Sequence, residues 1–203
     1  MTQEISIQLS ASIIYVTGTV NGVSVEFTLA ENNTWCAVVE KSENQIYDVE
    51  IIGYDSLGHS TTYSLKLYYG FLVITDRTWE DVIHRTTKGC YTADDFNRVG
   101  TAIVYLAEKL NEYGYHPSVD VKINWFVSDI PPLSLMETYL ANVQALINAY
   151  YTLTTTPAPP ASMANLTFTD ANNIEQILLD MNTLLENMIA QFKFSDTFYC
   201  GEV

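Results

Sequence analysis

The spacing of apolar residues changes once along the chain, and this change limits the folds open to it more than any other feature. Up to Tyr69 apolar residues recur at every second position, which is typical of half-buried strands. After Gly70 they recur with the 3.6-residue period of an amphipathic helix. The sequence therefore predicts a strand-rich domain over residues 1–72 and a helical domain over residues 73–203.

The first part predicts about six short strands. The apolar-alternating runs lie at residues 4–9, 13–20, 23–29, 35–39, 47–51 and 63–67. Asn21-Gly22, between the second and third runs, is a strong hairpin signal. Regular spacing of such short strands favours a small antiparallel sandwich.

Residues 55–60 hold an acid, a glycine and a histidine at a bend between the last two runs. We expect Asp55 to accept backbone N–H bonds in this turn and Gly58 to supply a positive φ. His59 would then stand at the tip without a role. This cluster is therefore interpreted as a turn and not as a site.

Four helices are predicted in the second part. They cover residues 77–88, 92–113, the residues after Ser134, and 170–192. The first would be capped by Thr75 or Asp76 and the last by Thr169, and two capping boxes are expected, Thr92 with Asp95 and Ser134 with Glu137. Residues 119–125 and 193–199 are predicted to pair as a minor two-stranded sheet. Residues 154–162 form a proline-rich connector.

The charge balance excludes several kinds of partner. A net charge of -15, from nine basic and 24 acidic residues, lacks the basic surface that nucleic acids or anionic membranes require. The N-terminus lacks the features of a secretory signal and no apolar run is long enough to span a membrane, so we expect synthesis in the cytoplasm. Cys36, Cys90 and Cys200 are interpreted as isolated thiols.

No residues form a convincing catalytic or metal-binding set, so we expect no enzyme activity, no cofactor and no metal. The three histidines, His59, His84 and His116, lie in different predicted elements. Two acidic pairs, Glu80-Asp81 and Asp94-Asp95, suit general acid–base chemistry, but they also suit the first turn of a helix. A calcium site at Asp48, Glu50 and Asp55 is disfavoured because no calcium-binding loop is present.

The predicted strands also resemble the last three strands of bacterial and phage immunoglobulin-like modules. The matching residues are Trp35-x-Ala37-x-Val39, Tyr47-x-Val49-x-Ile51 and Asp55-x-x-Gly58. The resemblance implies that the Tyr47 ring packs in the core while its hydroxyl fastens the preceding crossover. Val49 stands where an antibody domain has its second bridging cysteine, so that disulfide is absent.

Residues 74–202 resemble a helical domain of structural proteins from phages and prophages of Firmicutes. The matching stretches are ITDRTWEDV, YTADDFNRVGTAIVYLAEKLNEYGY, WFVSDIPPLSLMETYLANVQALINAY and FTDANNIEQILLDMNTLLENMIAQF. The resemblance implies a non-enzymatic virion component, in head, neck, tail or fibre, whose partners are other virion proteins or further copies of itself. The alternative is an adhesion module that binds host-surface glycan or a cell-wall polymer.

Tyrosine supplies the candidate contact surface, since the chain has 14 of them. Exposed tyrosines favour protein and sugar contacts because they present a rigid ring with a polar tip. The candidates are Tyr54, Tyr68 and Tyr69 near the outer face of the sandwich, and Tyr113, Tyr115, Tyr150 and Tyr151 at helix ends. Packing in the core or between domains is the competing interpretation.

Overall fold

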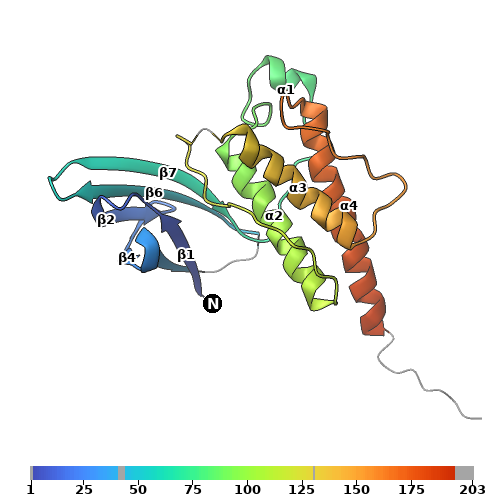
Figure 1. Ribbon diagram of the computed structural model, residues 1–203, viewed down its shortest axis with the longest axis horizontal. Coiled ribbons are helices and arrows are strands. Elements are labelled where there is room, and N and C mark those ends of the chain that lie inside the picture. The colour runs from blue at the N-terminus through green and yellow to red at the C-terminus, as the bar shows by residue number, and fades with distance from the viewer. Residues whose placement is uncertain (1, 41–43, 130, 195–203) are drawn as a thin grey trace, which may run out of the picture.

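The computed structural model describes residues 2–40, 44–129 and 131–194, and within them strands come first and helices follow (Figure 1). The strands are β1 Thr2–Gln8, β2 Ile13–Val20, β3 Val23–Val25, β4 Thr28–Leu29, β5 Thr34–Glu40, β6 Ile46–Asp55 and β7 Ser60–Tyr68. The helices are α1 Trp79–Ile83, α2 Ala93–Glu112, α3 Leu133–Ala149 and α4 Phe168–Phe194, with a short 3-10 turn at Glu31–Asn33.

The strands form two antiparallel sheets, one of three strands in the order β1-β5-β4 and one of four in the order β3-β2-β6-β7. Exposed and buried residues alternate along β6, as the period of two predicts. Ile7 and Trp35 from one sheet and Val49, Ile51 and Leu65 from the other share a single buried core.

The predicted fold class is wrong. It joined an immunoglobulin-like sandwich to a helical domain with its own minor sheet, whereas the structure has two sheets of three and four strands, both before residue 69, and four helices in the described ranges. Residues 119–125 form no strand, and most of the expected partner at 193–199 lies outside the described residues. The division at residue 72 stays a prediction.

Amide side chains of two helices bond to the backbone of residues 119–125, the segment predicted to join the minor sheet. The Asn142 side chain accepts the Asp120 N–H at 2.8 Å and donates to its carbonyl at 2.6 Å. Asn97 makes the same pair of bonds to Trp125, at 2.7 and 2.9 Å. At Asp120 and Trp125 the backbone groups are therefore satisfied by amides of α2 and α3 and not by a pairing strand.

Strand β7 joins the sheets to the helices. It runs toward α2 in Figure 1, and the Asn97 side chain of α2 donates to the Lys66 carbonyl at 3.0 Å. Lys66 also pairs with Asp94 at 3.3 Å. Beyond α2, the Val127 N–H donates to the Ser64 carbonyl at 3.0 Å. The two parts of the chain are thus connected through both side chains and backbone.

The helix boundaries follow the capping residues only in part. Helix α2 begins at the predicted capping box, in which Asp95 accepts the Thr92 N–H at 2.9 Å. Helix α1 is shorter than predicted and is capped by Thr78 with Asp81, because their side chains and backbone groups bond reciprocally. Neither Thr75 nor Asp76 caps it.

Two further predicted caps are wrong. Helix α3 begins after Pro132, so Ser134 lies inside its first turn, and Glu137 accepts a bond from the Ser162 hydroxyl at 2.7 Å in place of completing a capping box. Helix α4 begins at Phe168, where Thr167 and Asp170 bond to each other's backbone, so Thr169 lies inside the helix.

The turn at residues 55–60 forms as predicted, except for its histidine. Asp55 accepts the N–H groups of Leu57 and His59, each at 2.9 Å, and Gly58 has a φ of +84°. His59 is not idle, because its Nδ1 lies 2.9 Å from the second Asp55 oxygen. The bond from His59 is the main reason why the pKa of Asp55 is lowered.

The Tyr47 hydroxyl donates to the Glu40 carbonyl, at the end of β5. We expect Tyr47→Phe to lower the free energy of unfolding by about 1 kcal/mol, because the Glu40 carbonyl loses a partly buried donor. Urea titration would measure the change. Tyr54→Phe, on the outer face of the same strand, is the control and should change stability little; equal losses for both variants would contradict the role of this bond.

Candidate functional site

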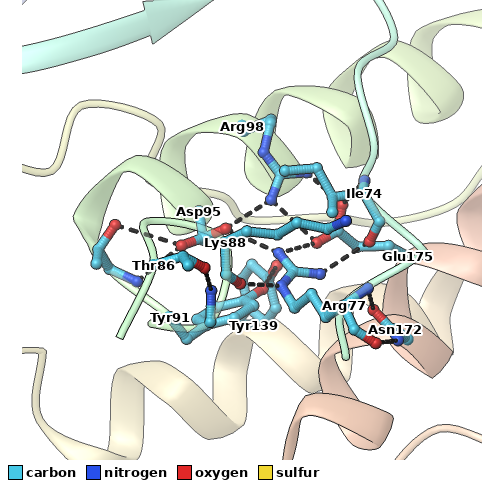
Figure 2. Close-up of polar contacts among 12 residues, drawn as sticks. Ile74, Arg77, Thr86, Lys88, Tyr91, Asp95, Arg98, Tyr139, Asn172 and Glu175 are labelled. Carbon is cyan, nitrogen blue, oxygen red and sulfur yellow. Dashed lines mark hydrogen bonds and ion pairs between the residues drawn. The ribbon is translucent and has the colours of Figure 1, made fainter. Parts of the chain in front are cut away.

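Four charged side chains meet in the interior of the helical part (Figure 2). Arg77 precedes α1, Asp95 and Arg98 lie one turn apart on α2, and Glu175 lies on α4. The exposed fraction of these side chains is between 0% and 8%. Such charges are buried only when they are paired. We call these four residues the ionic cluster.

Each carboxylate of the ionic cluster contacts both guanidinium groups. Arg77 Nη2 lies 2.8 Å from Asp95 Oδ1 and 2.7 Å from Glu175 Oε1. Arg98 Nη2 lies 2.6 Å from Asp95 Oδ1 and 3.0 Å from Glu175 Oε1, and its Nη1 pairs with the other Glu175 oxygen. Two positive and two negative charges therefore cancel within one buried group.

The ionic cluster also holds the chain that leads into α1. Arg77 donates through Nη1 to the Ile74 carbonyl at 2.8 Å and through Nε to the Lys88 carbonyl at 3.1 Å. Asn172 on α4 bonds to both the N–H and the carbonyl of Arg77, at 3.0 and 2.8 Å. Residues 74–88 are thereby fastened to α2 and α4 although they carry only one short helix.

These contacts decide the chemistry open to the cluster. Burial alone would lower the pKa of Arg98, but the bonds and charges of Glu175 and Asp95 outweigh burial and raise it. Asp95 places one oxygen on the two arginines and the other on the Thr92 N–H. Its lone pairs are engaged in structural bonds, so the arrangement suits a fixed electrostatic joint better than proton transfer.

The other acids considered for acid–base chemistry also have structural partners. Asp94 pairs with Lys66 on β7, and Asp81 caps α1. Glu80 lies 3.3 Å from His84, the residue that follows the last residue of α1, on an exposed surface. Among the described residues no group of three or more His, Cys, Asp or Glu side chains could hold a metal ion.

Two tyrosines lie beside the ionic cluster, Tyr139, which is buried, and Tyr91, which is half-buried. The Arg77 guanidinium lies 5.5 Å from the centre of the Tyr91 ring, and the Tyr91 and Tyr139 hydroxyl oxygens are 2.6 Å apart. Burial is the main cause that raises the pKa of both tyrosines, and the Glu175 charge adds to the effect. Both phenols therefore stay protonated in the folded protein at pH values where an exposed tyrosine ionises.

We expect the free energy of unfolding to fall as the pH rises above about 10, the ordinary pKa of tyrosine. The unfolded chain releases these two phenol protons there while the folded chain retains them. The contribution of the two phenols to stability is therefore complete below that pH and is lost as the pH rises above it. Urea titration at a series of pH values would show a shallower loss for Tyr139→Phe. Equal slopes for Tyr139→Phe and the wild-type protein would contradict the assignment.

The predicted tyrosine surface divides into separate groups. Tyr115, Tyr150 and Tyr151 lie together, with ring centres 4.8 Å apart for the first two and 5.7 Å apart for the last two. Tyr151 is 73% exposed, whereas Tyr150 is half-buried. Burial is the main cause that raises the pKa of Tyr150. Tyr113 is exposed near the end of α2, and the ring contacts that join this group do not include it.

The sheet tyrosines have different surroundings. Tyr68 is not a surface residue, because α2 packs on the end of β7 and leaves it 8% exposed. Tyr69 is half-buried with its ring edge on Tyr47, 5.3 Å between centres, and burial raises its pKa to about 12. Tyr54 pairs with Tyr15, 5.8 Å between ring centres, on the outer sheet face.

Sequence reasoning missed Tyr15 and the ionic cluster. The sequence pattern places Tyr15 in a strand and does not mark it as a surface residue, whereas the register pairs it with Tyr54. A signal for the cluster exists in the helices, where Glu175 lies close to the apolar stripe of Ile174, Ile177 and Leu178. A charge so close to a buried face indicates a buried partner, but the sequence does not say which one.

Comparison of the chain with protein families, with curated proteins and with solved structures gave no match. No helix within the described residues has the length and apolar character needed to cross a membrane.

Proposed function

We propose that the chain is a non-enzymatic structural component of a bacteriophage virion, held in the particle by contacts with other virion proteins. The resemblance of residues 74–202 to phage helical domains gives the particle context. One observation carries the proposal. The acidic side chains that would suit catalysis, among them Asp81, Asp94 and Asp95, serve instead as helix caps and ion pairs that fix one arrangement of the helices.

A fixed arrangement is what a particle subunit requires, since it must present the same surfaces in every copy. The ionic cluster secures the helices, and Asn97 connects α2 to the sheets. Apolar side chains remain exposed away from these joints, among them Tyr15 at 58% and Tyr151 at 73%. Such side chains favour contacts between proteins.

Immunoelectron microscopy of purified particles tests this proposal. Antibodies raised against the full chain should label particles from the lysogen or phage that encodes it, at one defined position. Particles from a strain in which the gene is deleted are the control. Absence of label from intact and partly disassembled wild-type particles, with the protein present in the lysate, would overturn the proposal.

Binding of a host-surface glycan or cell-wall polymer is the second candidate function. One observation favours it, the exposed Tyr15–Tyr54 pair beside Thr17 and Thr62 on the outer sheet face. Aromatic rings next to hydroxyl groups suit sugar rings. Full-length protein should then be retained by purified host cell walls and Tyr15→Ala should be released. Equal retention of both, or retention of neither, would remove this candidate.

A further inference from the structure

Strand β1 is the outer strand of the three-stranded sheet, and its free edge opens into the largest cavity described in the protein. Among residues 2–40, 44–129 and 131–194, the pairing order β1-β5-β4 leaves one side of β1 without a strand. The cavity measures about 740 Å³ and lies between β1, the end of β7, α2 and residues 123–124. We call it the edge groove.

The backbone of β1 offers hydrogen-bonding groups to the edge groove. Antiparallel strands turn alternate residues toward and away from the partner strand. The Leu9 N–H reaches the Asn33 carbonyl on the β5 side, whereas the Glu4 carbonyl accepts the Tyr69 hydroxyl at 3.4 Å from across the groove. The Gln3 side chain also donates to the Glu4 carbonyl, at 2.9 Å, so this acceptor is already engaged. The N–H groups of Glu4 and Ser6 and the Ser6 carbonyl also point into the groove, where an added strand could pair with them.

The opposite wall of the edge groove is acidic. Glu108 and Glu112 are exposed on α2 and line the groove, as does Glu4 on β1. Among the lining residues that the structure describes, Lys109 is the single basic side chain, and its Nζ lies 3.6 Å from Glu112. The wall thus carries an excess of negative charge, which favours a cationic occupant.

We propose that the edge groove binds an extended, lysine- or arginine-bearing segment of a partner protein, which adds as a strand to β1. Backbone pairing with Glu4 and Ser6 would supply affinity, and Glu108 and Glu112 would select basic side chains. A second copy of this chain is a poor occupant because each copy carries a net charge of -15. The groove would accept such a segment whether or not the chain belongs to a virion, so the two proposals fail separately.

Fluorescence anisotropy with the full chain tests the inference. The probe is a labelled peptide as long as β1, 7 residues, that alternates lysine with threonine and valine. We expect it to bind, and binding should slow hydrogen exchange at the Glu4 and Ser6 amides. Two control peptides separate the contributions: one is N-methylated along its pairing edge, and one carries glutamate in place of lysine. Both should bind at least ~10-fold more weakly.

Variants of the groove complete the test. Ser6→Pro removes the outward N–H at an edge position where proline is tolerated, whereas Ser6→Ala keeps it. The double variant Glu108→Lys with Glu112→Lys changes only exposed side chains. We expect weak binding for the proline and lysine variants and wild-type binding for Ser6→Ala. No binding of the lysine peptide, or binding unaffected by N-methylation or by charge reversal, would overturn the inference; the peptide controls decide it even if Ser6→Pro does not fold.

Discussion

Glu175→Gln should lower the free energy of unfolding by about 3–5 kcal/mol, the loss typical when one partner of a buried ion pair is removed. The substitution keeps the shape of the side chain but leaves Arg77 and Arg98 with only the Asp95 charge between them. Because the Glu175 side chain is fully buried, solvent cannot compensate for the lost charge. Urea titration followed by circular dichroism would measure the loss.

Glu186→Gln is the matched control, because it makes the same chemical change at an exposed position of the same helix. Its effect should stay within about 0.5 kcal/mol. Adding Arg98→Met to Glu175→Gln restores neutrality and should recover part of the lost stability. Equal effects of Glu175→Gln and Glu186→Gln would contradict the role assigned to the ionic cluster.

Asn97→Ala should destabilise the protein by about 3 kcal/mol and loosen the connection between sheets and helices. The buried amide makes three bonds, to the Lys66 carbonyl and to both backbone groups of Trp125. Each buried group left without a partner costs about 1–3 kcal/mol. Urea titration measures the total, and hydrogen exchange at the Trp125 amide, whose acceptor is removed, measures the local effect.

Asn187→Ala, at an exposed position of α4, is the control and should change neither stability nor exchange appreciably. The hydrogen-exchange result separates two explanations of a loss in stability. Faster exchange of Trp125 and β7 amides relative to the α4 core would support a joint at Asn97. Unchanged exchange with wild-type stability would contradict it.

Sequence patterns predicted elements whose determinants are local. Helix α2 carries its cap at Thr92 and Asp95 and its buried stripe at regular spacing, so residues 93–112 needed no tertiary information. The turn at Asp55 and Gly58 likewise follows from residues next to each other in the chain. The alternation along β6 marked its buried face correctly.

Features that depend on distant residues were not predictable in the same way. Residues 119–125 alternate like a strand, but amides from α2 and α3 take the backbone bonds of Asp120 and Trp125. Glu137 has capping-box spacing yet bonds to Ser162, 25 residues away. The ionic cluster combines side chains from α2, from α4 and from the segment before α1. Two of its members, Arg98 and Glu175, are 77 residues apart in the sequence. Only the packed helices bring these groups together.

Quantitative mass spectrometry of gradient-purified particles tests most directly whether the chain is a virion component. The proposal predicts that its peptides are present at a constant ratio to those of the major particle proteins across independent preparations, and that the ratio survives a high-salt wash. A strain with the gene deleted sets the background. Peptides at background level in washed particles, while the protein is abundant in the lysate, would contradict the proposed function.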